Sequence, residues 1–192
     1  MSLHADARRT LAAWTPPDGF QNALREQYLA HLEAHEDAMW RACHPDHLTA
    51  SAIVIAEDAS AIALTLHAKL GRWLQFGGHC EPEDASVAGA AERETREESG
   101  IGALHLDPTP LLLSRHEVPC GPLRPAHHLD VQFLAVAPAE APLTVSEESA
   151  DVRWFALDDL PVDTDATVRA LSAAAVRRLR DSPRRAPSSR SD

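Results

Sequence analysis

Three glutamates lie close together in one short segment of the sequence: Glu94, Glu97 and Glu98. The segment is rich in alanine, Asp84 or Ser86 can cap its start and Gly100 can end it, so we expect a helix. On a helix the three glutamates share one face, because their spacing is three and four residues. Like charges this close repel each other unless a hard divalent cation neutralises them. The spacing therefore predicts a site for Mg²⁺ or Mn²⁺.

Several neighbouring residues fit chemistry on phosphate groups. Carboxylates on one rigid helix can hold a divalent ion and leave coordination positions for water and phosphate oxygens. Arg93 directly precedes the cluster, so it can pair with a carboxylate and orient it. Gly77 and Gly78 have no side chains, which lets a ligand approach their backbone closely. Asp84 adds a carboxylate from the connecting loop, as an outer metal ligand.

The order of these residues resembles a known motif, the Nudix box, whose pattern is G-x5-E-x7-R-E-U-x-E-E-x-G-U with U a bulky apolar residue. The matching positions are Gly78, Arg93, Glu94, Glu97, Glu98, Gly100 and Ile101. Asp84 stands in place of the first glutamate, and the gap from Asp84 to Arg93 is one residue longer than in the pattern. Thr95 replaces the usual aliphatic residue. The opening GGHxEPxD resembles a subgroup of bacterial Nudix proteins that carry this extra residue.

The resemblance implies a fold and a reaction. The fold is an α/β/α sandwich with a mixed β-sheet. The enzyme is a Nudix-type pyrophosphohydrolase, which uses Mg²⁺ or Mn²⁺ to cleave a phosphoanhydride bond in a nucleoside diphosphate linked to another moiety. The implied metal ligands are Glu94, Glu97, Glu98 and Asp84. The implied catalytic residues are Arg93, Glu97, Glu98, Glu147 and Glu148, the last two as alternative general bases before the final strand.

Three other interpretations stay open. An acidic, Ala-rich helix is often only a solvated surface helix, although here the glycines, the arginine and the glutamates occur together in the order of the motif. A second alternative is a catalytically weak Nudix-fold module that binds a nucleotide or regulates a partner. The third is an isomerase acting on a prenyl diphosphate, which needs a catalytic cysteine. Cys80 lies within the motif, which disfavours this third reading.

The rest of the chain predicts the elements that must position these residues. Apolar residues at helical spacing predict helices over residues 3–14 and 19–40. Alternating or continuous apolar runs predict strands that begin near residue 48 and cover 52–56, 62–66, 103–106, 111–116, 128–137 and 152–155. A last helix is expected over residues 165–180. Strands before and after one central helix predict an α/β sandwich.

Other polar residues are candidates for substrate contacts because they lie near the motif or on a facing strand. The proposed substrate-binding residues are Gly77, Gly78, Arg72, Trp73 and His128. Five further potential zinc ligands lie around a connection rich in Pro and Gly: His116, Cys120, His127, His128 and Asp130. Scattered histidines in a polar loop are, however, more common than a zinc site. His31 and His35 have the spacing of a zinc pair but lack the H-E-x-x-H pattern.

Charge and composition limit the partners and the location. The formal net charge of -11 argues against nonspecific binding to nucleic acid or to an anionic membrane. A nucleotide substrate remains compatible, because a bound metal reverses the local field. The sequence shows no long apolar run and no signal-peptide pattern, so we expect a cytoplasmic protein. The expected partner is a small-molecule nucleotide.

The length of 192 residues fits one domain with extensions. We expect a helical extension over residues 1–47, the Nudix hydrolase domain over 48–180 and a disordered tail over 181–192, where Pro, Ser and Arg predominate. The extension could cap the core, form a homodimer contact or shape the substrate pocket, and the sequence does not decide among these roles.

Deletion of residues 182–192 tests the expected tail. Because this segment has almost no apolar side chains to bury, the truncated protein should keep the melting temperature and the activity of the full chain. Thermal unfolding followed by circular dichroism, together with an activity assay, measures both quantities. A large drop in either would mean that the tail packs against the domain.

Overall fold

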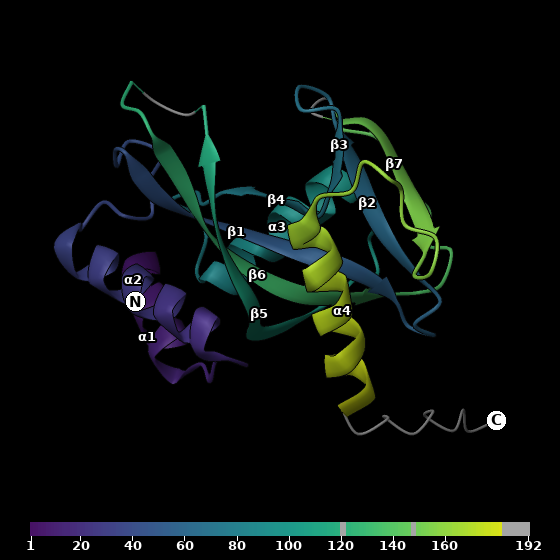
Figure 1. Cartoon of the computed structure of the whole chain (residues 1–192), viewed down its shortest axis with the longest axis horizontal. Coiled ribbons are helices and arrows are strands. Elements are labelled where there is room, and N and C mark those ends of the chain that lie inside the picture. The colour runs from purple at the N-terminus through teal and green to yellow at the C-terminus, as the bar shows by residue number, and fades with distance from the viewer. Residues whose placement is uncertain (120–121, 147–148, 182–192) are drawn as a thin grey trace.

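The computed structural model describes residues 1–119, 122–146 and 149–181, and a mixed β-sheet lies between its helices (Figure 1). In chain order the elements are α1 (Leu3–Ala13), α2 (Gly19–Ala34), β1 (Asp46–Ala56), β2 (Ala61–His67), β3 (Arg72–Leu74), β4 (Phe76–His79), α3 (Val87–Ser99), β5 (His105–Val118), β6 (Ala126–Ala137), β7 (Ser149–Ala156) and α4 (Ala166–Asp181).

A long parallel pair forms the centre of the seven-stranded sheet. β1 runs parallel to β6 along its whole length, from Asp46 opposite His127 to Ala56 opposite Ala137. The remaining pairs are antiparallel: the main order is β3-β2-β1-β6-β5, β4 also pairs with β1, and β7 also pairs with β2. Ten of the eleven residues of β1 are buried, as expected of a strand covered on both faces.

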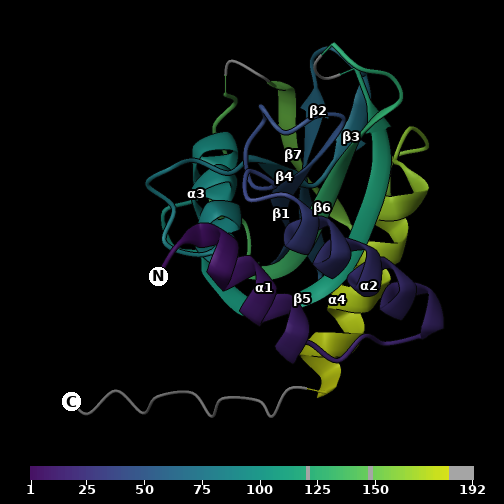
Figure 2. The same ribbon diagram turned by 90° about the vertical axis from the view of Figure 1, so that its left-hand side faces the viewer.

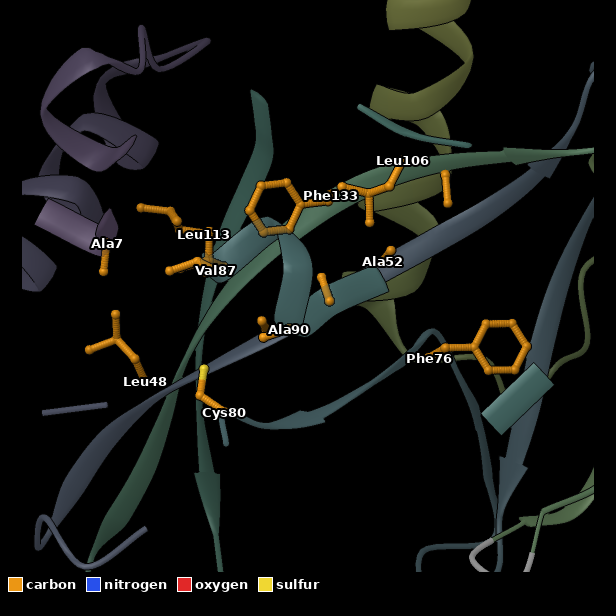
Figure 3. Close-up of a cluster of buried hydrophobic side chains, with 14 of the residues drawn as sticks. Ala7, Leu48, Ala52, Phe76, Cys80, Val87, Ala90, Leu106, Leu113 and Phe133 are labelled. Atoms are coloured by element: carbon orange, nitrogen blue, oxygen red, sulfur yellow. The ribbon is translucent and has the colours of Figure 1, made fainter. Parts of the chain in front are cut away.

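The two faces of the sheet carry separate apolar cores, because successive side chains of a strand point to opposite faces. On one face Ala52 and Phe133 belong to the same cluster as Val87 and Ala90 of α3 (Figure 3). On the other face Ile53 and neighbouring apolar residues pack with α4. Figures 1 and 2 show α3 and α4 on opposite sides of the sheet. The predicted α/β/α sandwich is confirmed.

The N-terminal helices pack on the domain and complete its first core. Six of their apolar side chains belong to the same buried cluster as Phe133: Leu3, Ala7, Leu11, Leu24, Tyr28 and Leu32. The carboxylate of Asp6 accepts a hydrogen bond of 2.9 Å from the backbone N–H of Val87, the first residue of α3. The Gln21 amide donates to the carbonyl of Leu113 and accepts from its N–H, at 3.0 and 2.7 Å. The extension therefore covers the core and caps α3.

The limits of α2 differ from the prediction. The first and last helices begin and end within one residue of the predicted positions. α2, however, ends at Ala34 and not at residue 40. His35 leaves the helical conformation with a φ of −133°, and the chain turns so that Ala38 and Met39 become buried. Burial of these two apolar side chains therefore takes the chain out of the helix.

The limits of two predicted strands also change. The strands predicted over residues 103–106 and 111–116 form one strand, β5, whose register is irregular between Asp107 and Leu112. Pro108 and Pro110 lie in this interval and have no N–H to donate to the ladder, which explains the irregularity. Residues 73–76 are divided between two short strands, because β3 pairs with β2 whereas β4 pairs with β1.

Residues 182–192 lie outside the described residues. Over the ranges that the structure does describe, none of the helices combines the length and the apolar character needed to cross a membrane.

Replacement of Gln21 by alanine tests the docking of α2 on β5. The variant leaves the buried N–H and C=O of Leu113 without the Gln21 amide. Each buried polar group left unpaired costs about 1–3 kcal/mol, so the free energy of unfolding should fall by about 2–4 kcal/mol in a denaturant titration.

Asn22→Ala is the matched control, because the Asn22 side chain bonds only to Glu26 on the exposed side of the helix. Its effect should stay below about 0.5 kcal/mol. An equally small effect of Gln21→Ala would mean that α2 does not depend on this contact.

Candidate active site

The helix that the glutamate spacing predicts is α3. The hydroxyl of Ser86 accepts a hydrogen bond of 3.0 Å from the N–H of Gly89 and caps the start of the helix. Gly100 ends it in the left-handed conformation, with a φ of 73°. Both predicted helix limits are confirmed, and the helix carries the three carboxylates in its last two turns: Glu94, Glu97 and Glu98.

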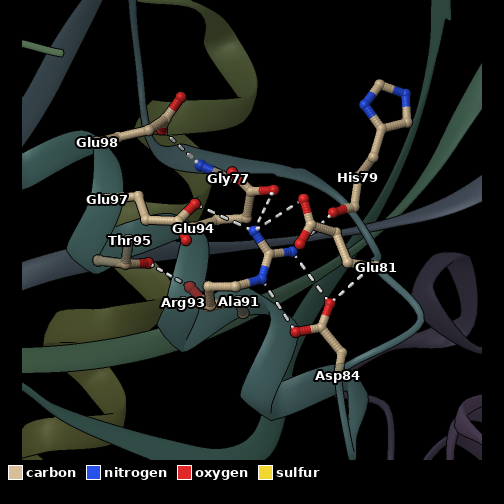
Figure 4. Close-up of polar contacts among 10 residues, drawn as sticks. All are labelled: Gly77, His79, Glu81, Asp84, Ala91, Arg93, Glu94, Thr95, Glu97 and Glu98. Carbon is tan, nitrogen blue, oxygen red and sulfur yellow. Dashed lines mark hydrogen bonds and ion pairs between the residues drawn. The ribbon is translucent and has the colours of Figure 1, made fainter.

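Arg93 joins α3 to the preceding strand and loop (Figure 4). Its Nε and Nη2 each donate to one carboxylate oxygen of Asp84, at 3.0 Å. Nη2 also donates to the backbone carbonyl of His79 at 3.0 Å. Nη1 donates to Glu94 and to Glu97, both at 3.1 Å. A residue expected to orient the carboxylates is thus in contact with two of them.

Asp84 faces Arg93 and not the open side of the carboxylate cluster. Its side chain is 5% exposed, and both of its oxygens accept from the guanidinium. One of these oxygens also accepts from the N–H of Glu81 at 2.8 Å. The sequence placed Asp84 among the metal ligands, whereas the structure places it where it holds Arg93.

The two glycines of the motif allow close packing at this point of β4. The N–H of Gly77 donates to a carboxylate oxygen of Glu98 at 2.9 Å. Gly77 has a φ of 152°, and a Cβ there would come within 2.3 Å of the Cβ of Ser51. A Cβ on Gly78 would lie 2.9 Å from the carboxylate of Glu94. A side chain at the first position would therefore collide with backbone, whereas one at the second position would meet only the carboxylate of Glu94.

Thr95, which replaces the usual aliphatic residue of the motif, and Cys80, which lies within the motif, are both buried. The Thr95 hydroxyl donates to the carbonyl of Ala91 at 2.6 Å, which satisfies the polar group within the helix. Burial raises the pKa of the Cys80 thiol to about 12. A thiol that stays protonated at neutral pH is a poor nucleophile, which weakens the isomerase interpretation further.

A cavity of about 420 Å³ lies beside these residues. Its lining consists of Arg41, Gly78, His79, Glu81, Arg93, Glu94, Glu97, Glu98 and Ser146. Four carboxylates face two guanidinium groups, so the cavity carries an excess of negative charge. Burial raises the pKa of Glu94 above its ordinary value; Arg93 opposes this shift, and the charges of Glu97 and Glu81 add to it.

The cavity fits a hard divalent cation. Its donors on the α3 side are carboxylate oxygens, which Mg²⁺ and Mn²⁺ prefer. The absence of a side chain at Gly78 leaves space directly beside the carboxylate of Glu94. The imidazole of His79 points away from the carboxylates (Figure 4). A divalent cation here would offset the excess negative charge.

Three proposed substrate contacts lie away from this cavity. Arg72 pairs with Asp165 near the start of α4, at 3.4 Å. Trp73 packs edge-on against Phe155, with 4.7 Å between ring centroids. His128 lies on β6 among other histidines and does not line the cavity. The structure therefore brings together only the glycines of the proposed substrate-binding set.

The structure adds two residues to the cavity that the sequence did not indicate, Arg41 and Ser146. Both come from irregular segments, where no periodicity signals which side chains face a site. The alternative general bases Glu147 and Glu148 lie outside the described residues.

The zinc group proposed around residues 116–130 is not formed by its described members. His127 interacts with Asp46, with 3.0 Å between Nδ1 and a carboxylate oxygen. Asp130 accepts from the hydroxyls of Thr49 and Ser51, at 3.1 and 2.6 Å. His116 and His128 do lie side by side, with 5.5 Å between ring centroids, and His128 also contacts His47 and His79. Cys120 lies outside the described residues.

Comparison with known proteins identifies the family. The chain matches the family model of the NUDIX domain over residues 45–180, which is more than half of its length. The chain therefore belongs to the Nudix family, and the resemblance inferred from the sequence is confirmed. This membership supports the predicted class of enzyme, a Nudix-type pyrophosphohydrolase. No curated protein matches the chain.

Solved structures share the fold. A MutT NUDIX hydrolase from Burkholderia pseudomallei is 25% identical, with a TM-score of 0.51 over 67% of this chain and 97% of the other. An Ap4A hydrolase from C. elegans, solved as a binary complex, is 18% identical, with a TM-score of 0.56 over 69% and 97%. The NUDIX domain of Shewanella oneidensis NrtR, complexed with ADP ribose, is 18% identical, with a TM-score of 0.56 over 72% and 92%.

Alanine at the two adjacent glycines should have different effects. Gly77→Ala forces a Cβ against the backbone and Cβ of Ser51 and should lower the free energy of unfolding by about 1–3 kcal/mol. Gly78→Ala meets only the end of the Glu94 side chain, which can rotate away. This variant should keep most of its stability and require more Mg²⁺ for half-maximal activity.

Denaturant unfolding and Mg²⁺ titration of both variants measure these effects. Equal losses of stability, with an unchanged Mg²⁺ requirement in Gly78→Ala, would mean that Glu94 does not depend on the space at Gly78.

Proposed function

We propose that this protein hydrolyses a phosphoanhydride bond in a nucleoside diphosphate linked to another moiety, with a divalent cation as cofactor. The observation that carries the proposal is the group of three carboxylates on α3, held by Arg93 and Gly77 beside a cavity with excess negative charge. A diphosphate is itself an anion, so it can enter this cavity only together with positive charge.

The proposed metal ligands are Glu94, Glu97 and Glu98, and the proposed ion is Mg²⁺ or Mn²⁺. When bound, such an ion offsets the charge of the diphosphate and lowers the pKa of a water molecule. The cavity supports this assignment, because its α3 side presents oxygen donors and its net charge is negative.

Each of the remaining groups has a defined task in the proposal. Arg93 keeps Glu94 and Glu97 in place, and the N–H of Gly77 keeps Glu98 in place. Arg41 is a second guanidinium on the cavity wall, where it can pair with a phosphate. One carboxylate must accept the proton of the attacking water. Glu97 and Glu98 are the first candidates, and Glu147 and Glu148 follow by resemblance.

Two structural neighbours support the class of substrate. One is described as an Ap4A hydrolase, and the other was solved with ADP ribose. Both compounds are nucleotides whose phosphates are joined by anhydride bonds. The carboxylates and the ion would recognise this shared diphosphate portion, and they leave the base, the sugar and the second moiety unspecified.

Glu97→Gln and Glu98→Gln test the proposal. Each change removes a negative charge from the proposed ligand set and should lower turnover by at least about 100-fold while the melting temperature stays near that of the wild type. The cleavage yields two phosphate monoesters, so the assay measures the phosphate that an added phosphatase releases from them, over a panel of nucleoside diphosphate derivatives with Mg²⁺ or Mn²⁺.

Glu92→Gln is the matched control, since Glu92 lies on the same helix and pairs with Arg96. It should keep wild-type turnover. Near-normal activity of both active-site variants would contradict the metal-ligand assignment. A wild-type protein that cleaves none of these compounds, yet is stabilised by a nucleotide, would support the binding module instead.

A further inference from the structure

Four histidines form a row across neighbouring strands on one face of the sheet. His47 of β1 lies opposite His128 of β6, which lies opposite His116 of β5. On the other side of β1, His79 of β4 lies opposite Thr49, two residues along the same face from His47. The register between strands far apart in the sequence therefore brings these rings together.

Three of these residues, His47, His79 and His128, form what we call the histidine triad. Their ring centroids lie 4.9 to 5.1 Å apart, and one potential ligand atom from each lies within 4.8 Å of the others. The Nε2 atoms of His47 and His79 are 3.1 Å apart and share a hydrogen bond, whose proton a metal ion would replace. Two nitrogens bound tetrahedrally to one zinc ion lie roughly 3.3–3.4 Å apart, since each Zn–N bond is about 2.0–2.1 Å. This pair is thus already near the required separation.

Nε2 of His128 is buried and lacks a hydrogen-bond partner among the described residues. His47 is only 1% exposed. Leaving a buried nitrogen unpaired costs about 1–3 kcal/mol, so such atoms in native proteins nearly always have a partner. The unpaired Nε2 of His128 points to a ligand that the described protein groups do not supply.

The chemistry of the triad differs from that of the carboxylate cavity. Burial lowers the pKa of His47 to about 4 and that of His128 to about 3, and it also lowers the pKa of His79. Neutral imidazole suits zinc, copper, nickel and iron, whereas Mg²⁺ prefers oxygen. The charge of Arg41 also lowers the pKa of all three rings, so it opposes a cation here. An anionic fourth ligand would offset this effect.

We propose that the histidine triad binds one transition-metal ion of the zinc class, at a site separate from the carboxylates of α3. Three protein nitrogens with an open fourth position make a known type of zinc site. His79 joins the two regions, because its ring belongs to the triad while its backbone carbonyl accepts from Arg93 at 3.0 Å. The ion would link β1, β4 and β6 and stabilise the strand against which Arg93 is held.

A second potential group lies beyond the end of α2 and competes with the triad for such an ion. It consists of His35, Asp37 and Cys43, whose ligand atoms also lie within 4.8 Å of one another. Burial raises the pKa of the Cys43 thiol to about 11, so a proton must leave before a metal can bind there. Two of its members are exposed, and the group is therefore less preorganised than the triad.

Binding of Co²⁺ to the full chain, first freed of metal with EDTA, tests the proposal. Co²⁺ replaces zinc and absorbs visible light strongly when its coordination is tetrahedral. The titration is made in excess Mg²⁺, which occupies oxygen sites. A single equivalent should bind with a tetrahedral spectrum and without the near-ultraviolet band of a thiolate ligand.

His128→Asn should weaken Co²⁺ binding by at least about 100-fold, since loss of even an outer partner of a ligand costs 10- to 100-fold. The matched control is His127→Asn, because His127 is the next residue on β6 and its ring pairs with Asp46. This control should keep wild-type affinity, and melting temperatures show whether both variants fold.

Absence of a tetrahedral Co²⁺ spectrum in the wild-type protein would overturn the proposal, whatever the variants do. A thiolate band that disappears in Cys43→Ser would assign the ion to the other group and would also overturn it. Equal losses in His128→Asn and His127→Asn would remove the triad assignment. The readout is independent of hydrolysis, so this proposal and the proposed function can fail separately.

Discussion

The guanidinium of Arg93 is the contact on which the candidate active site depends. A planar group with five N–H donors can bond to several acceptors in fixed directions at once. Here it bonds to a loop carboxylate, a strand carbonyl and two helix carboxylates. A lysine would have the same charge but only three donors on a flexible stem, so it could not hold these segments together. The relative position of strand, loop and helix therefore follows from one side chain.

This contact also explains the unusual loop before α3. The carboxylate of Asp84 faces Nε and Nη2 of Arg93 together, so the loop with the extra residue must bring Asp84 back beside α3. Arg93 neutralises only part of the surrounding charge, since four carboxylates and two guanidiniums line the cavity. Hydrogen bonds thus hold the side chains of the site in place, but its net charge is negative. A negative charge suits the binding of a cation.

Short-range features were predictable from the sequence, whereas contacts set by strand register were not. Ser86 and Gly100 identify the limits of α3 because capping is a local property of the chain. The glutamate spacing likewise identifies one face of that helix. The pairing of His47 with His128 depends on a parallel register between segments eighty residues apart, which no local pattern reports. Arg41 was missed for the same reason, since the tertiary fold alone brings its turn to the cavity.

The hydrogen bond from Val87 to Asp6 joins α3 to a helix that lies before the family match. The family match starts at residue 45, but a buried carboxylate from residue 6 accepts one of the backbone N–H groups at the start of α3. Negative charge at this end of a helix also offsets its dipole. The family match is therefore shorter than the segment whose side chains form the buried core. The two N-terminal helices contribute side chains to the core on which α3 packs, although they lie before the family match.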